Sequence, residues 1–193
     1  MTRARVPWVT LGFVGAQLAA NVAAGTHRGP LPPDLLRRWG VSAGAVIGHL
    51  ELWRLASATL LTLGPGMLLR QVLFAGLALG VHEHRLGARR TLATFAVADA
   101  GSILSVLSVL AARGPAGDGL TALHDVGMSG GGFGLLGSLA GAGPHRRTLV
   151  VAGALALLGE AALRFDPLTD GIHLVAFLAG AAMGWRAEPP RRA

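Results

Sequence analysis

The 193-residue chain contains no cysteine, and charged residues make up only 14% of it. Without cysteine, the chain can form neither a disulfide framework nor a cysteine-ligated metal site. Apolar residues make up 52% of the chain, which also has 29 glycines, and the mean hydropathy is +0.53. Apolar runs recur from one end to the other, which argues against a soluble enzyme with a single anchor. The sequence therefore predicts an all-α polytopic membrane protein, with one domain over residues 1–193.

The formal net charge of +7 raises the question of a nucleic-acid partner. However, the arginines form short clusters between the apolar runs, where positive residues flank membrane helices. We therefore predict the lipid bilayer as a partner and no nucleic acid.

Six apolar runs are long enough to be read as membrane helices, at 6–25, 66–81, 92–112, 128–143, 149–163 and 172–185. A cleaved signal peptide is an alternative for the first run, which follows a basic start and ends in small residues. We favour a helix there, because it makes the later charge pattern alternate. The mixed segment 26–65 has only short apolar pieces with Trp and Arg beside Leu. It predicts an interfacial loop between the first and second helices.

Six spans put both termini on one side of the membrane. The loops and tails on that side hold ten arginines and two acidic residues, a balance of +8, whereas those on the other side hold six of each. Because positive residues favour the cytoplasmic side, the tails 1–5 and 186–193 are predicted to be cytoplasmic. We also expect the protein in the plasma membrane.

Ser129 lies among glycines at the point where a polar loop becomes an apolar helix. A serine hydroxyl is a poor nucleophile unless a base takes its proton. His173 is the only histidine that begins a membrane-length run, and the topology places it on the same outer side as Ser129. The sequence therefore predicts a Ser129–His173 dyad inside a membrane.

Small residues offer a way to bring these two helices together. They recur at or near every fourth position, at Gly130, Gly134, Gly137 and Gly141 in one helix and at Ala176, Gly180 and Gly184 in the other. Such a spacing lets helix backbones approach closely in lipid. A seam between the two helices would carry His173 toward Ser129.

Four motifs in this order resemble those of the rhomboid family of intramembrane serine proteases. They are Glu-Leu-Trp-Arg at 51–54, Glu-x-x-x-Gly at 83–87, Gly-x-Ser-Gly at 127–130 and Asp-Gly-Ile-His at 170–173. The resemblance covers roughly residues 50–184. It implies a six-helix rhomboid-like bundle with Ser129 as nucleophile and His173 as base, and without a third carboxylate, cofactor or metal. The implied substrates are transmembrane or juxtamembrane segments of membrane proteins.

One departure concerns the side chains that stabilise the oxyanion. Family members usually carry His and Asn at positions that fall here on Met67 and Gln71. Methionine cannot donate a hydrogen bond, whereas glutamine can, from a longer arm. We expect Gln71 and Gly127 to support the oxyanion site. The alternative function is a catalytically inactive rhomboid-like protein that binds client helices; a small transporter is a third.

Other polar residues receive structural interpretations. His82 and His84 alternate at a helix end beside arginines, so we expect no metal there. The His-Asp pair at 124–125 is read as an outer-surface loop pair rather than part of a triad. Asp99 and Glu160 are carboxylates within membrane runs, and we expect each to be protonated or hydrogen-bonded between helices. The oligomeric state stays open.

Overall fold

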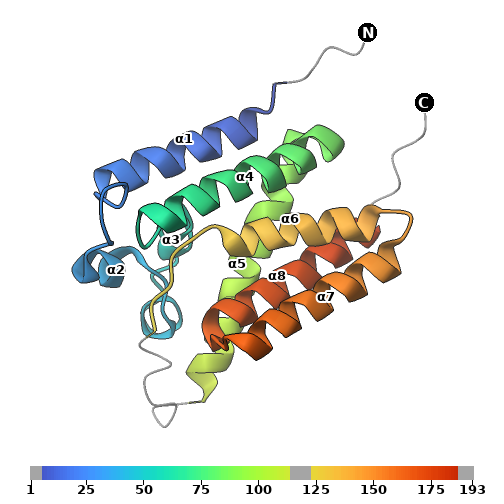
Figure 1. The fold of residues 1–193 in the computed structure, drawn as a ribbon. Coiled ribbons are helices and arrows are strands. Elements are labelled where there is room, and N and C mark those ends of the chain that lie inside the picture. Colours follow the sequence, from blue (N-terminus) through green and yellow to red (C-terminus); the bar gives the residue numbers. More distant parts are fainter. Residues whose placement is uncertain (1–5, 114–122, 187–193) are drawn as a thin grey trace.

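The computed structural model describes residues 6–113 and 123–186, and helices make up most of these residues (Figure 1). The longer helices are α1(Trp8–Ala23), α4(Pro65–Leu86), α5(Ala88–Ala112), α6(Ser129–Ala142), α7(Arg146–Leu163) and α8(Pro167–Arg186). They correspond in order to the six apolar runs, so the all-α fold class is confirmed. The tails predicted at 1–5 and 186–193 lie outside the described residues, apart from Arg186, which ends α8.

Several helix boundaries differ from the sequence prediction: α4 continues to Leu86 and α5 already begins at Ala88. The segment before residue 172 was expected to be a loop, but α8 begins at Pro167. Asp166 accepts hydrogen bonds from the backbone N–H groups of Leu168 and Thr169, and proline is favoured in the first turn. The α7 helix likewise begins at Arg146, before its apolar run. Hydrophobicity locates the run, whereas capping residues and charged turns set the helix ends.

Within the described part of the chain, α4, α5 and α8 are the helices long and apolar enough to cross a bilayer. The α1 helix is apolar but has only 16 residues, and α6 has 14. The count of six spans therefore stays a prediction.

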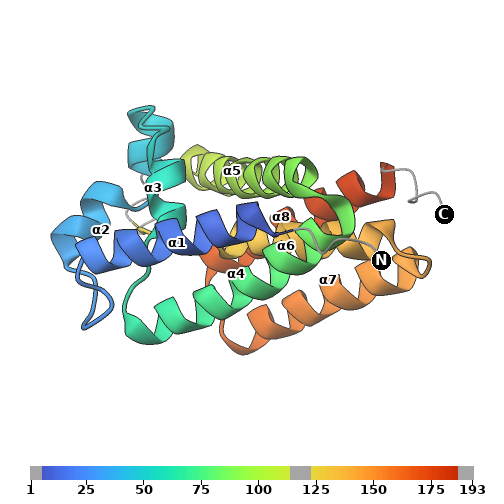
Figure 2. The ribbon, with the colours of Figure 1, turned by 90° about the horizontal axis from the view of Figure 1, so that it is seen from above.

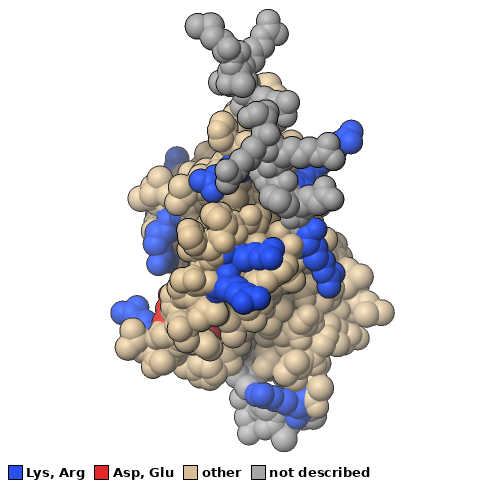
Figure 3. Space-filling model, turned by 90° about the vertical axis from the view of Figure 1, so that its right-hand side faces the viewer, with Lys and Arg blue, Asp and Glu red and all other residues tan. Residues whose placement is uncertain are grey.

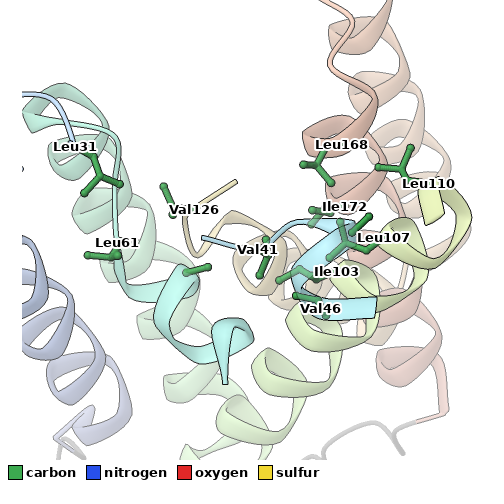
Figure 4. Packing of buried hydrophobic residues seen from close by; sticks show 12 residues of the cluster. Leu31, Val41, Val46, Leu61, Ile103, Leu107, Leu110, Val126, Leu168 and Ile172 are labelled. Carbon is green, nitrogen blue, oxygen red and sulfur yellow. The ribbon is translucent and has the colours of Figure 1, made fainter. Parts of the chain in front are cut away.

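The segment expected to be an interfacial loop contains α2(Pro33–Trp39), a π-helical turn η1(Gly44–Gly48) and α3(Arg54–Leu60). Arg54 is buried, and its guanidinium donates to the backbone carbonyls of Arg37 and Gly40 and pairs with Glu51. A buried apolar cluster in this segment packs against α5 and α8 (Figure 4). The Trp-Arg motif therefore ties together the segment between α1 and α4.

The helix that begins with Ser129 lies among α4, α5, α7 and α8 (Figures 1 and 2). Its six glycines from Gly130 to Gly141 are all buried. A Cβ on Gly180 of α8 would clash with the backbone of Gly134, and a Cβ on Gly137 would clash with the backbone of Phe177. The predicted small-residue seam between α6 and α8 is thus present as backbone-to-backbone contact.

The neighbouring helix α7 is packed differently. None of its residues is buried, and a cavity of about 370 Å³ lies between it, α5 and α8. Leu158 of α7, Val109 of α5 and Leu174 of α8 are among the residues that line this cavity. Of the four helices that pack around α6, α7 is therefore the most loosely held, since α4, α5 and α8 all have buried residues.

The Glu-x-x-x-Gly motif joins α1, α4 and α5. The Glu83 carboxylate accepts hydrogen bonds from the backbone N–H groups of Val9 and Thr10 and from the Thr10 hydroxyl, at 2.8–3.0 Å. It thereby satisfies N–H groups in the first turn of α1 that have no partner within the helix. Gly87 has φ +85° at the junction of α4 and α5, a conformation that favours glycine.

Arginines gather on one end of the bundle (Figure 3). This end holds the last turns of α4 and α8 and the first turns of α5 and α7 (Figure 1). Arg146 of α7 stacks on the ring of Trp185 there, 4.2 Å from its centroid. Ser129 is the first residue of α6, whose last turn lies at this basic end, so the serine sits toward the opposite end of the bundle.

Candidate active site

Ser129 is held by a short extended segment that enters α6. Asp125 pairs with Val41 through two backbone hydrogen bonds of 3.0 Å, and the Gly127 N–H donates to the carbonyl of Ala58 at 2.8 Å. Gly127 has φ +131°, which favours glycine. A Cβ there would also clash with the side chain of Gln71. Gly127 is therefore required by both its backbone conformation and the lack of space.

His173 lies in the second turn of α8, and its Nε2 atom is 2.8 Å from the Oγ of Ser129. The α6–α8 seam brings the two residues together, as the sequence suggested. The ring of Phe133, one turn after Ser129, lies 4.4 Å from the imidazole between centroids, at an angle of 41°. The ring of Phe74 in α4 packs against Phe133, with 5.4 Å between the two ring centroids. The aromatic rings restrict how far the imidazole can turn.

The first turn of α6 offers backbone donors next to the Ser129 hydroxyl. In the described part of the chain, the N–H groups of Ser129 and Gly130 donate to no acceptor, whereas the N–H of Gly131 donates to Asp99 Oδ1 at 2.7 Å. Free N–H groups at a helix N-terminus attract negative charge. An oxyanion formed at Ser129 would find two such donors in place.

Gln71 and Met67 both border Gly127, where the sequence analysis placed an oxyanion site. A Cβ on Gly127 would meet the Gln71 Nε2 and the Met67 Cε atoms. The Gln71 Oε1 accepts hydrogen bonds from the N–H of Met128, at 3.2 Å, and from Nε2 of Gln17, at 2.9 Å. The amide nitrogen of Gln71 is thus left on the side of Gly127.

The two intramembrane carboxylates behave differently. Asp99 is buried and hydrogen-bonded between helices, as predicted: its second oxygen accepts from the Thr59 hydroxyl at 2.6 Å. The prediction that Glu160 is hydrogen-bonded between helices, one of the two expected arrangements, was wrong, because its side chain is on the exposed face of α7. Hydrophobicity marked both as membrane residues, but only the packing of α7 shows which way Glu160 points.

The remaining polar residues singled out in the sequence lie apart from the dyad hydrogen bond. His82 is buried and contacts the hydroxyls of Thr91, at 2.8 Å, and Ser138, at 3.2 Å, whereas His84 is exposed. The Asp125 carboxylate accepts from the N–H of Val126 at 2.8 Å. Over residues 6–113 and 123–186, no three His, Asp or Glu side chains are grouped as metal ligands.

Sequence reasoning missed the polar face of α1. Thr10, Gln17 and Asn21 are buried, and Asn21 Oδ1 accepts from the N–H and the hydroxyl of Thr62, at 3.0 and 2.7 Å. Their spacing of seven and four residues places them on one side of a helix. That periodicity is a signal by which these contacts with α4 and the loop after α3 could have been found.

The Rhomboid domain family model matches residues 49–189. The chain belongs to the rhomboid family. A comparison with the curated proteins finds no match. The resemblance drawn from the four motifs is therefore confirmed, and with the apolar helices it identifies an integral membrane protein. Because rhomboid proteins include both serine proteases and inactive relatives, membership alone does not assign an activity.

Proposed function

We propose that this rhomboid protein is an intramembrane serine endopeptidase that cleaves transmembrane or juxtamembrane segments of membrane proteins. The observation that carries the proposal is the 2.8 Å separation of Ser129 Oγ and His173 Nε2. That distance lets the imidazole accept the hydroxyl proton as the oxygen attacks a peptide carbonyl. The domain would extend over residues 1–193, with both termini cytoplasmic and the protein in the plasma membrane.

The reaction would proceed through an acyl-enzyme. Ser129 Oγ attacks the scissile carbonyl carbon, and His173 takes the serine proton at Nε2. The oxyanion of the tetrahedral intermediate would accept from the N–H groups of Ser129 and Gly130 and from Nε2 of Gln71. His173 then gives its proton to the leaving amine. A water molecule, deprotonated by His173, attacks the ester and restores Ser129.

The histidine works without an aspartate partner in this arrangement. In the described ranges, no carboxylate hydrogen-bonds to His173, whose imidazole instead packs against Phe133. Ring packing and the hydrogen bond to Ser129 take the orienting role that an aspartate has in a triad. A dyad is therefore the form of catalysis that the side chains support.

The alternative, an inactive relative that binds client helices without cutting them, is favoured by Met67. Its thioether cannot donate to an oxyanion, and its sulfur accepts from the N–H of Leu63 at 3.3 Å. Loss of one oxyanion donor typically lowers a rate by about 10²–10³. The dyad supports a slow enzyme over an inactive one, because Gln71 and the helix N-terminus retain donors.

Covalent labelling by a fluorophosphonate probe tests the proposal on protein purified in detergent. We expect labelling of the wild type, none of Ser129→Ala, and full labelling of Ser105→Ala, an exposed serine of α5 that serves as the matched control. Cleavage of a model client helix should follow the same order. Neither labelling nor cleavage by the wild type, with client binding intact, would instead identify the inactive relative.

A further inference from the structure

We propose that Gln17 of α1 is a positioning residue that turns the Gln71 amide so that its nitrogen faces the oxyanion formed at Ser129. The inference rests on the proposed function, since only an acyl-transfer reaction produces that oxyanion. The Nε2 of Gln17 donates to the Oε1 of Gln71 at 2.9 Å, and both side chains are buried. The contact joins α1 to Gln71, which in turn contacts Met128 just before Ser129.

Two donors meet at one end of the Gln71 amide. Besides Gln17, the backbone N–H of Met128 donates to the same Oε1 at 3.2 Å. With its oxygen held from two sides, the amide must direct its nitrogen toward Gly127. Among the described residues, that nitrogen has no acceptor, and it is not one of the fully buried unpaired atoms, which are Gln17 Oε1 and His27 Nδ1. It is therefore free to donate to an oxygen that arrives at Ser129.

The unpaired oxygen of Gln17 argues against a purely stabilising role. Gln17 is fully buried, and its Oε1 has no hydrogen-bond partner in the described part of the chain. An unsatisfied buried carbonyl destabilises a fold, so an apolar side chain of similar size would suit α1 better for stability alone. A buried polar atom that lacks a hydrogen-bond partner, and so lowers stability, is typical of a residue that serves a functional site.

Without Gln17, the orientation of the Gln71 amide would be less well defined. The terminal torsion of glutamine has broad, roughly two-fold preferences, so the two orientations exchange the oxygen and the nitrogen. The flipped orientation would point a carbonyl oxygen at the oxyanion and repel it. The N–H of Met128 alone would then have to select the productive orientation. Loss of Gln17 should lower turnover without altering how the client helix binds.

Turnover of a model client helix tests this through Gln17→Leu, Gln71→Leu and the double variant. We expect Gln71→Leu to lower kcat by about 100-fold, as for loss of one oxyanion donor, and Gln17→Leu by about tenfold with KM unchanged. Because Gln17 acts through Gln71, the double variant should be no slower than Gln71→Leu alone. Thr10→Val, which removes another buried α1–α4 hydrogen bond, should lower thermal stability but not kcat.

A second readout does not depend on turnover. The side-chain NH₂ resonances of Gln71, assigned by their loss in Gln71→Leu, should shift and broaden in Gln17→Leu if the amide is released. Gln17→Met, which is unbranched, replaces the leucine variant if packing suffers. Wild-type kcat and unchanged Gln71 resonances in a folded Gln17 variant would overturn the inference. A wild type without turnover would refute the proposed function, while the resonances would still decide the role of Gln17.

Discussion

Asp99, in α5, accepts a hydrogen bond from the backbone N–H of Gly131, in the first turn of the helix that carries Ser129. The same carboxylate accepts from the hydroxyl of Thr59 in α3. The buried Asp99 side chain therefore joins α3, α5 and α6. A carboxylate in an apolar bundle is costly, but here both oxygens have partners.

Replacement of Asp99 by alanine should destabilise the protein more than replacement by asparagine. Asp99→Ala leaves the Gly131 N–H unpaired, which costs about 1–3 kcal/mol. Asparagine can still accept from Gly131, while the Thr59 hydroxyl can donate to the carbonyl of Leu55, 2.6 Å away. Thermal unfolding in detergent would measure both variants. Equal stability of Asp99→Ala and wild type would contradict the assigned role.

The α6–α8 seam predicts a difference between two glycine-to-alanine changes. In Gly180→Ala the new methyl group meets the backbone of Gly134, and such overpacking typically costs about 1–3 kcal/mol. At Gly101 of α5 nothing lies within 4 Å of the added Cβ, so Gly101→Ala should be neutral or gain up to about 1 kcal/mol from helix propensity. The unfolding temperature and the rate of fluorophosphonate labelling should both fall in Gly180→Ala, and neither should fall in Gly101→Ala. If both variants unfold alike, the seam is not as close as described.

If Ser129 and His173 form a dyad, replacing either residue should cost as much activity as replacing both. Ser129→Ala, His173→Ala and the double variant should lose nearly the same activity, because a base without its nucleophile contributes little. Client cleavage measures the loss, and thermal unfolding close to that of the wild type shows that the seam is intact. A double variant far slower than either single variant would mean that the residues act separately.

The loop before α6 contains a group that should make stability depend on pH. Burial raises the pKa of Asp125 to about 7, and the nearby Asp166 and Asp99 add to the rise. The folded state then holds a proton that the unfolded chain releases near pH 4, so stability should fall as pH rises from about 4 to about 7 and level off above that.

Raising the pH from 5 to 8 should therefore lower the stability of the wild type relative to that of Asp125→Asn. The side-chain oxygen of asparagine can still accept from Val126. Thermal unfolding from pH 5 to 8 measures this difference, with the exposed Asp34→Asn as the control for one lost charge. A constant difference between wild type and Asp125→Asn across this range would show that Asp125 is charged in the fold.

Membrane orientation follows from the basic end of the bundle. Reporter fusions after Arg147 and after Gly117, which lies outside the described residues, should report opposite sides, with Arg147 cytoplasmic. The physical reason is the balance of +8 against zero between the two sets of loops. Reporters on the same side would contradict the predicted membrane span between these two positions, α6.

The sequence predicted the helices and the pairing of Ser129 with His173 because both depend on local patterns. Apolar runs give the helices, and glycine spacing gives the seam. The start of α8 was placed too late, since Asp166 and Pro167 cap a turn that hydrophobicity does not mark. The exposure of Glu160 could not be predicted, because it depends on which face of α7 the other helices cover.

The surroundings of Gln71 were predicted only in part. Its position follows from counting along α4, but the direction of its amide depends on Gln17, 54 residues earlier in the chain. Such a contact leaves no trace in local periodicity beyond a polar face on α1. Long-range hydrogen bonds between helices are thus the part of the site for which three-dimensional structure was needed.

The close contact of α6 with α8 has a mechanical consequence for how a client could enter. Because the two backbones touch without intervening side chains, neither helix can slide or roll past the other without steric clash, so we expect Ser129 and His173 to move as one rigid unit. Lateral opening of the bundle is then expected at α7, which has no buried residue and lies beside a cavity. For the proposed protease, α7 would then admit the client while α6 and α8 keep Ser129 and His173 aligned, so the bundle could open without separating the two residues.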